Sequence, residues 1–223
     1  MIPLKDKNPT SRIPVVNISI IVLNVTAFLY ELSLGEELGN FFMQYGVVPY
    51  YFSEALVSGA YIPSLFVSPF SSMFLHGGIM HLGGNMLYLW IFGDNVEDKL
   101  GRGRYVLFYL LCGLTASIAH ILIAPGSEVP TVGASGAISG VLGAYLLMFP
   151  RARVLTVIPI FFFLQVAELP ALVVLGLWFV LQFFNGLAAL GPETAGMGGV
   201  AWWAHIGGFV AGLLLVKPFR KFQ

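Results

Sequence analysis

The eleven Lys and Arg residues of this chain fall into only four short clusters, at positions 5–12, 99–104, 151–153 and 217–221. The three stretches between the clusters are long and mostly apolar. Basic residues that flank membrane spans mark the cytoplasmic side of the membrane. The pattern therefore predicts that all four clusters lie on one side, with an even number of spans between neighbouring clusters.

The composition excludes several classes of protein. Hydrophobic residues make up 57% of the 223 residues and charged residues only 10%, whereas a soluble domain has about 25% charged residues. A soluble globular enzyme and a disordered chain are both excluded by these values. The formal net charge of zero suggests no nucleic-acid partner. The single cysteine, Cys112, excludes an internal disulfide and a multi-cysteine metal site, and we expect no metal and no cofactor.

Each apolar stretch has room for two helical spans, because one span needs about 20 residues. The six predicted spans cover residues 15–34, 76–96, 105–124, 135–149, 169–187 and 202–216. The predicted fold class is therefore an all-α polytopic membrane protein, with one membrane domain over residues 1–223 and both termini cytoplasmic. The fourth span is short, so its outer end is expected below the membrane surface, beside protein or a water-filled cavity.

Three segments between the spans are expected on or near the membrane surface. Residues 35–75 are too long for a simple turn, and their aromatic residues predict a long outer loop that partly enters the interface. The aromatic residues 161–163 predict a second interfacial segment, and residues 191–199 predict a glycine-rich outer loop.

The N-terminal region resembles neither a cleaved signal peptide nor an organelle transit peptide. No small-residue cleavage site follows the first apolar stretch, and the segment before it is short and not rich in Arg and Ser. We therefore expect a retained first span and a prokaryotic plasma membrane.

Four polar residues within the predicted spans are the candidates for function, because polar groups inside a membrane are costly. Ser135 begins the fourth span and His205 lies on the sixth, while His81 and Asn85 share one face of the second. At a rise of about 1.5 Å per residue, all four lie about 18–27 Å above the next basic cluster. This range predicts one polar layer in the outer half of a hydrocarbon core of about 30 Å.

Small residues at every fourth position allow two of these helices to approach closely. The stripes are Gly136, Gly140 and Ala144 on the fourth span, and Ala204, Gly208 and Gly212 on the sixth. Close approach would bring the Ser135 hydroxyl to the imidazole of His205, with Ser135 as nucleophile and a neutral His205 as general base. No Asp or Glu lies near His205 on its helix, so a dyad is predicted rather than a triad.

The start of the fourth span also predicts an oxyanion hole. The first N–H groups of a helix lack intrahelical partners, and the helix dipole adds partial positive charge there. The side chains of Asn85 and His81 lie at similar depth and complete the predicted set of donors.

Four motifs in this order resemble those of the rhomboid intramembrane serine proteases. They are His81-x-x-x-Asn85, Glu97-x-x-Leu100-Gly101-x-Gly103, Gly133-x-Ser135-Gly136 and Ala204-His205-x-x-Gly208-x-x-x-Gly212. The resemblance implies a six-helix rhomboid fold and cleavage of single-span membrane proteins near their outer ends. It also implies the roles of Ser135 and His205 as a catalytic dyad, and of Asn85, His81 and the Ser135 N–H as oxyanion stabilisers. Gly133, Gly136 and Gly208 are implied as supporting residues.

One position departs from the family pattern. Many rhomboids carry an aromatic residue four positions after the nucleophile, under the catalytic histidine, and this chain has Ser139 there. Either another ring supports His205, or the imidazole is held less firmly.

Other interpretations of the same residues stay open. A serine in a membrane helix often only donates to a backbone carbonyl, and His81 and Asn85 could serve as polar contacts between helices. Glu97 is expected to cap a helix or pair with a basic neighbour. At the level of function, the alternatives are a catalytically silent rhomboid-like protein that binds membrane clients, and a transporter or channel. A transporter is disfavoured because no internal repeat is evident.

Overall fold

The structure is a computed structural model that describes residues 1–59, 63–160, 163–190 and 199–219. Helices occupy all six ranges in which spans are predicted. They are α1 (Val15–Ser33), α5 (Ile79–Leu100), α6 (Arg102–Ile123), α7 (Ser135–Met148), α8 (Ala171–Ala188) and α9 (Trp202–Phe219). The largest difference in bounds is at α5, which begins three residues later than predicted and extends to Leu100.

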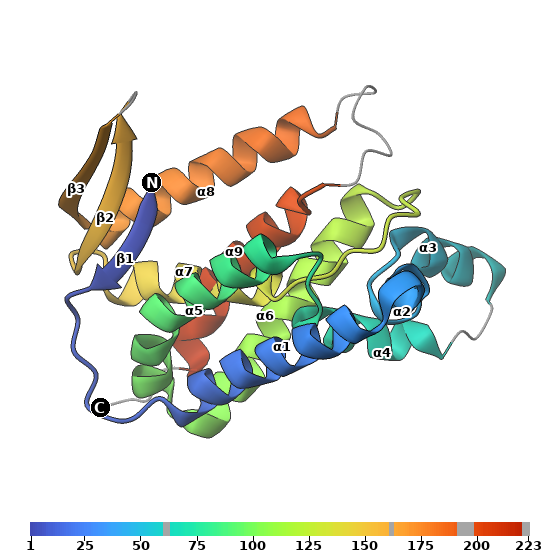
Figure 1. Ribbon diagram of the computed structural model, residues 1–223, viewed down its shortest axis with the longest axis horizontal. Helices are drawn as coiled ribbons and strands as arrows, with labels where there is room; N and C mark the ends of the chain where they lie inside the picture. Colours follow the sequence, from blue (N-terminus) through green and yellow to red (C-terminus); the bar gives the residue numbers. More distant parts are fainter. Residues whose placement is uncertain (60–62, 161–162, 191–198, 220–223) are drawn as a thin grey trace.

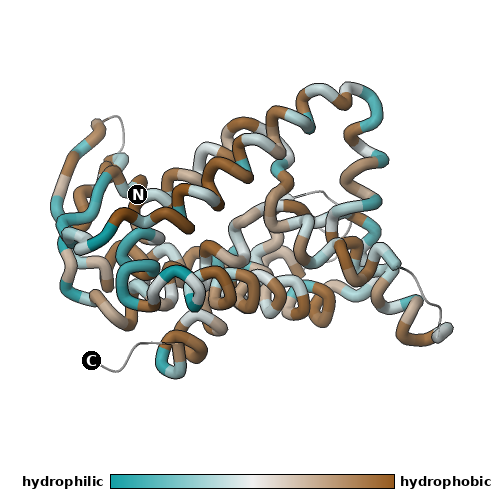
Figure 2. The backbone as a smooth tube through the Cα atoms, turned by 90° about the horizontal axis from the view of Figure 1, so that it is seen from below, coloured by the Kyte–Doolittle hydropathy of each residue, from teal (hydrophilic) through white to brown (hydrophobic). Residues whose placement is uncertain are grey.

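Four of these helices, α1, α6, α8 and α9, are long and apolar enough to cross a membrane. Helix α5 carries four charged residues in its last two turns, and α7 has only 14 residues. Large hydrophobic side chains such as Leu29, Leu122 and Leu214 are exposed on the outer helices, and hydrophobic residues line most of the long helices in Figure 2. Because lipid rather than water suits such a surface, the chain is an integral membrane protein.

The segments that carry the basic clusters lie toward one end of the molecule. In Figure 1 these are the N-terminal strand, the turn between α5 and α6, the connection after α7 and the end of α9. The short helices between α1 and α5 lie toward the opposite end. This arrangement agrees with the prediction that the four basic clusters lie on one side.

The prediction of a long loop over residues 35–75 was wrong, because most of this segment is helical. It contains η1 (Gly35–Glu37), α2 (Leu38–Tyr45), α3 (Pro49–Ser58), α4 (Ser64–Ser71) and η2 (Ser72–Phe74). Pro49 occupies the first turn of α3, where a missing N–H has no consequence. Gly59 ends that helix with a φ of 68°. Helices of eight to ten residues are too short to be recognised by a criterion based on span length.

The fold is also not all-α, since the chain forms a three-stranded antiparallel sheet in the order β1–β2–β3. Strand β1 (Ile2–Asp6) pairs with β2 (Arg153–Ile160), which pairs with β3 (Phe163–Pro170). In β2 the side chains of Val154 and Thr156 are buried, as expected for alternation along a strand. Strands β2 and β3 were not predicted from the sequence because the largely apolar run between Val154 and Leu164 hides that alternation, and β1 has only five residues.

Two of the predicted surface segments lie partly outside the described residues. Of the aromatic residues 161–163, Phe163 is the first residue of β3. Residues 161–162 and 191–198, which carry the rest of these two predictions, lie outside the described residues.

Helix α7 lies at the centre of the helical packing, and residues 136–145 are all buried. It packs against α9 at positions where both helices carry glycine. A methyl group on Gly208 would overlap the backbone oxygen of Gly136, and one on Gly212 would overlap that of Gly140. The predicted small-residue stripes therefore form the contact between these two helices, with backbone against backbone.

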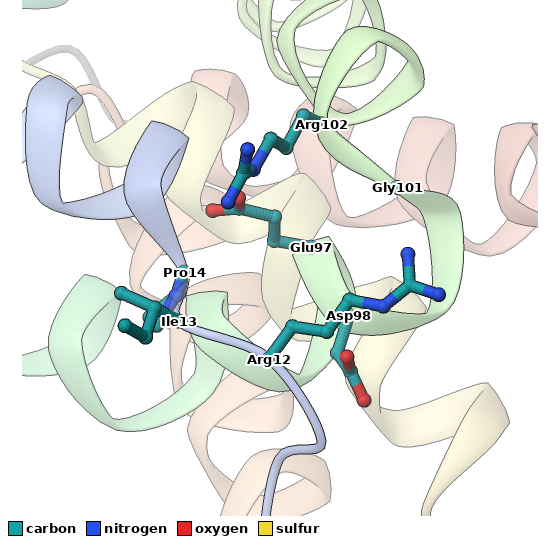
Figure 3. A pocket seen from close by; sticks show the side chains of 7 residues that line it. All are labelled: Arg12, Ile13, Pro14, Glu97, Asp98, Gly101 and Arg102. Atoms are coloured by element: carbon teal, nitrogen blue, oxygen red, sulfur yellow. The ribbon is translucent and has the colours of Figure 1, made fainter.

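The buried carboxylate of Glu97, near the C-terminal end of α5, binds the N-terminal end of α1. It accepts hydrogen bonds from the backbone N–H groups of Val16 (3.2 Å) and Asn17 (2.7 Å). These are among the first N–H groups of α1, so Glu97 caps that helix as expected. Figure 3 shows Glu97 at a pocket of about 300 Å³, with the Arg102 side chain directed toward it.

Candidate active site

Ser135 and His205 are hydrogen-bonded to each other. Ser135 is the first residue of α7 and His205 lies in the first turn of α9. The distance from Ser135 Oγ to His205 Nε2 is 2.8 Å, and His205 is buried. These two side chains are 70 positions apart in the sequence, so the packing of α7 against α9 brings them together.

The two residues line a cavity of about 760 Å³ to which helices α5 to α9 all contribute. The cavity wall also includes His81 and Asn85 from α5 and Gly133 from the segment before α7. All five of these residues were singled out from the sequence, and the structure brings them to one cavity. Their catalytic roles are not tested by this geometry and stay predictions.

Gly133 and His81 lie next to each other beside Ser135. Gly133 has a φ of 134°, a conformation that favours glycine. A Cβ atom at Gly133 would lie 2.8 Å from Nε2 of His81 and 3.5 Å from Oγ of Ser135. A side chain at this position would therefore collide with the His81 ring and occupy the space in front of the Ser135 hydroxyl.

Asn85 is held by His76, which precedes α5 rather than belonging to it. The Asn85 Nδ2 atom lies 2.9 Å from Nε2 of His76. The backbone N–H of His76 donates in turn to the buried carboxylate of Glu31 on α1, at 3.1 Å from Oε1. An amide nitrogen has two protons, so Asn85 has a second proton in addition to the one that contacts His76.

Two residues of α8 that contact His205 were not predicted from the sequence. Gln182 Oε1 lies 2.7 Å from His205 Nδ1, and the ring of Trp178 lies 5.9 Å from that of His205 with 32° between their planes. Gln182 is a buried polar residue in a helix that is otherwise mostly apolar. The rule that identified His205, that polar groups inside spans are candidates for function, would have identified Gln182 as well.

Ser139 has a local partner instead of contacting His205. Its hydroxyl donates to the backbone oxygen of Ser135 at 2.6 Å, one turn earlier in α7. The aromatic neighbours of His205 come from elsewhere, namely Trp178 on α8 and Trp202, whose ring lies 6.1 Å away edge-on. The sequence left two alternatives, another ring beside His205 or an imidazole that is held less firmly. The structure shows the first, since other rings lie beside His205.

The hydrogen-bond pattern defines what the site can do chemically. If Nδ1 of His205 donates to the Gln182 oxygen, Nε2 carries a lone pair and can accept the Ser135 proton. The N–H groups in the first turn of α7 lack intrahelical acceptors, and Ser135 is the first residue of that turn. Within the described residues, no group of three or more His, Cys, Asp or Glu side chains could hold a metal ion.

Comparison with known protein families gives one decisive match. The model of the Rhomboid domain family matches residues 64–222, which is most of the chain. The chain belongs to the rhomboid family. The match includes α5 to α9 and hence every residue discussed above as part of the cavity wall.

Named relatives come from a bacterium and from mitochondria. The chain is 51% identical over 72 residues to rhomboid protease GluP of Bacillus subtilis, which is 32% of this chain and 14% of that protein. It is 31% identical over 156 residues to the mitochondrial rhomboid protein 1 of Saccharomyces cerevisiae, covering 66% of this chain and 40% of the relative. With the mouse mitochondrial presenilin-associated rhomboid-like protein, identity is 31% over 132 residues, or 56% and 35% of the two chains.

The matched regions therefore span 14–40% of the length of these three curated relatives. Two of the three are named as mitochondrial. The relatives thus give no support to the expectation of a prokaryotic plasma membrane, although membrane integration itself follows from the helices.

Proposed function

We propose that this rhomboid is an intramembrane serine endopeptidase in which Ser135 is the nucleophile and His205 the general base. The observation that carries the proposal is the 2.8 Å contact between Ser135 Oγ and His205 Nε2 at the wall of a large cavity. A serine hydroxyl is a weak nucleophile unless a base can accept its proton, and this contact supplies that base.

The proposed reaction follows the general course of serine hydrolysis. As Ser135 Oγ attacks the scissile carbonyl carbon, Nε2 of His205 takes the hydroxyl proton and then delivers it to the leaving amine. The resulting ester is attacked by water, whose proton again passes to His205. The ester bond then breaks and the proton returns to Ser135, so the enzyme is regenerated.

The oxyanion that forms in each step needs donors that are already in place. We assign this role to the backbone N–H groups at the start of α7, the free amide proton of Asn85, and the His81 ring. The neighbouring Gly133 supports the assignment, because a side chain there would obstruct the space between His81 and Ser135. Gly136 and Gly208 support the site by allowing the backbones of α7 and α9 to touch.

We assign single-span membrane proteins as substrates. In this proposal the six helices α1 and α5 to α9, including the short α7, cross the bilayer as one membrane domain with both termini on the cytoplasmic side. A substrate helix must unwind to expose its scissile carbonyl, so Gly or Pro in the substrate span is expected to accelerate cleavage. A cavity of about 760 Å³ leaves room for water and for a short unwound segment.

The test is cleavage of a single-span model protein by the purified chain in liposomes, with product masses read by mass spectrometry. The wild type is expected to give one product pair, while Ser135→Ala and His205→Ala give none. Ser19→Ala is the matched control, because Ser19 lies on α1 and donates only to the backbone of Val15. Equal product from all variants would refute the assignment of the dyad.

The alternative is a rhomboid-like protein that binds membrane clients without cleaving them. A serine-reactive phosphonate separates the two functions when no cleavage occurs. Labelling of wild type and of Ser19→Ala, but not of Ser135→Ala or His205→Ala, would demonstrate an activated Ser135 and leave the substrate to be found. No labelling of the wild type would favour the client-binding protein.

A further inference from the structure

We propose that helix α8 orients the general base, with Gln182 as the residue that fixes the proton and the rotation of the His205 ring. This inference rests on the proposed function, since it assigns a positioning role for the base of that reaction. Three observations support it: the polar contact of Gln182, the ring contact of Trp178, and the way in which α8 meets α9.

The first observation is the burial and direction of Gln182. Its neighbours Leu181 and Phe183 are exposed, whereas Gln182 is buried and directed inward. Its Oε1 atom lies 2.7 Å from Nδ1 of His205. An amide oxygen can only accept, so Nδ1 must carry the proton and Nε2 the lone pair that faces Ser135. The contact therefore selects the one neutral form of the imidazole that can act as a base.

The second observation is that Trp178 lies one helical turn before Gln182, on the same face of α8. Its ring is 5.9 Å from the ring of His205 and is itself held between Tyr88 (6.4 Å) and Phe209 (6.1 Å). Position 139, where many rhomboids carry the supporting aromatic residue, holds a small side chain that is bonded elsewhere. Helix α8 thus supplies both a hydrogen-bond acceptor and a ring to the same imidazole.

The third observation is that α8 contacts α9 differently from the way in which α7 does. Ser135 and His205 are on α7 and α9, which touch through their backbones. Gln182 and Trp178 are on α8, which contacts α9 through side chains such as Phe179, stacked on Phe209 at 4.6 Å. A shift of α8 would therefore break the Gln182 contact without separating the backbones that carry the nucleophile and the base. The orientation of the base depends in this way on the position of α8.

A neutral amide suits this environment better than a carboxylate. A buried carboxylate would require an uncompensated charge within the bilayer as long as the imidazole is neutral. Gln182 selects the same form of the ring that an aspartate selects in a catalytic triad, but introduces no charge.

The test compares two substitutions of Gln182 that differ in one property. Gln182→Met keeps the length of the side chain but removes the acceptor, whereas Gln182→Glu keeps an acceptor oxygen in either protonation state. We expect Gln182→Met to lower kcat about tenfold, as for loss of one hydrogen bond that acts in the transition state, with KM unchanged. Gln182→Glu should retain more activity than Gln182→Met. Gln165→Met, at an exposed position of β3, is the matched control.

A second measurement does not depend on cleavage. In the resting protein with ¹⁵N-labelled histidine, the His205 signals are identified by their loss in His205→Ala. The wild type and Gln182→Glu should show a proton on Nδ1, and Gln182→Met a mixture of the two neutral forms. This readout would fail to change if Gln182 had only a packing role, and it stays informative if the chain proves to cleave nothing.

The outcomes separate the two proposals. An unchanged distribution of the proton in folded Gln182→Met refutes the positioning role, whatever the activity. If Gln182→Met does not fold, a loss of the Nδ1 proton in Gln182→Glu refutes it instead. Failure of the protease assignment would appear only in the Ser135→Ala and His205→Ala experiments.

Discussion

Helices α7 and α8 both pack against α9 near the active site, but they do so through different kinds of atoms. The contact of α7 is made by backbone, since a methyl group on Gly208 would overlap the backbone oxygen of Gly136. The contact of α8 is made by side chains. A Cβ atom at Gly186 would lie 3.2 Å from the terminal carbon of Ile206 and 3.4 Å from Trp202 Cβ.

This difference separates two requirements of a catalytic pair. Backbone atoms cannot change rotamer, so the α7–α9 contact fixes how far Ser135 lies from His205. Side chains can adjust, so the α8–α9 contact leaves room for small shifts that alter the direction of the His205 ring. The packing of α7 on α9 thus sets the distance between Ser135 and His205, and α8 sets the orientation of the His205 ring.

The largest expected effect comes from a methyl group at the α7–α9 contact. Gly208→Ala should lower the free energy of unfolding by about 1–3 kcal/mol, because neither backbone can yield without displacing a whole helix. The cleavage rate should fall along with it, as Ser135 and His205 separate. Unfolding in mixed detergent micelles and cleavage of the model substrate measure the two effects.

The control for this substitution lies on α8. A Cβ atom at Gly176 would meet nothing within 4 Å, so Gly176→Ala should leave the free energy of unfolding unchanged or raise it by up to about 1 kcal/mol through helix propensity. Equal stability of Gly208→Ala and Gly176→Ala would show that the α7–α9 contact is not as rigid as the structure indicates.

The next effect is on rate rather than on stability. Trp178→Leu should lower kcat about three- to tenfold, the equivalent of one aromatic contact, whereas Trp178→Phe keeps a ring and should lose less. Trp90→Leu is the control, since Trp90 is 61% exposed on α5. A larger loss of kcat in Trp90→Leu than in Trp178→Leu would contradict the role given to α8.

Much of this arrangement could be predicted from sequence because the relevant signals are local. Basic clusters delimit the apolar stretches, and a polar residue such as His205 stands out within a span. Its depth follows from counting residues to the next cluster. The stripe that contains Gly208 also indicates which face of α9 packs closely.

Two kinds of feature could not be predicted: the rotation of a helix about its own axis, and the pairing of strands that are far apart in the sequence. Counting residues gives the depth of Gln182 but not the direction in which it faces, because α8 is apolar on all sides. The pairing of β1 with β2 joins segments about 150 positions apart, and nothing in either segment specifies the other. The departure at Ser139 was visible in the sequence, but its replacement by Trp178 was not.

A smaller effect is expected where α8 meets α9 through flexible side chains. Gly186→Ala should change the free energy of unfolding by less than about 1 kcal/mol, because the terminal carbon of Ile206 can rotate away and the added methyl favours the helix. The same detergent unfolding experiment tests this value. If Gly186→Ala lowered the free energy of unfolding as much as Gly208→Ala does, the α8–α9 contact would be no more adaptable than the α7–α9 contact.

The smallest expected effect lies at the C-terminal end of α7, which is the end remote from Ser135. Tyr145 on α7 donates to Asp6 on β1 at 2.6 Å, and burial raises the pKa of the Asp6 carboxyl. A raised pKa means that the folded protein favours the protonated form. This contribution to stability is therefore present at low pH and is lost as the pH rises through the pKa of the folded state.

Asp6→Asn removes this titration and keeps a side-chain oxygen that can accept from Tyr145. We expect its unfolding midpoint to vary less between pH 4 and 7 than that of the wild type, and to be equal or slightly higher at pH 7. Its cleavage rate should be unchanged, because the contact involves neither Ser135 nor the residues of α8 that touch His205. If the wild type instead gained stability relative to Asp6→Asn as the pH rises, the carboxylate would be the form that holds β1 to α7.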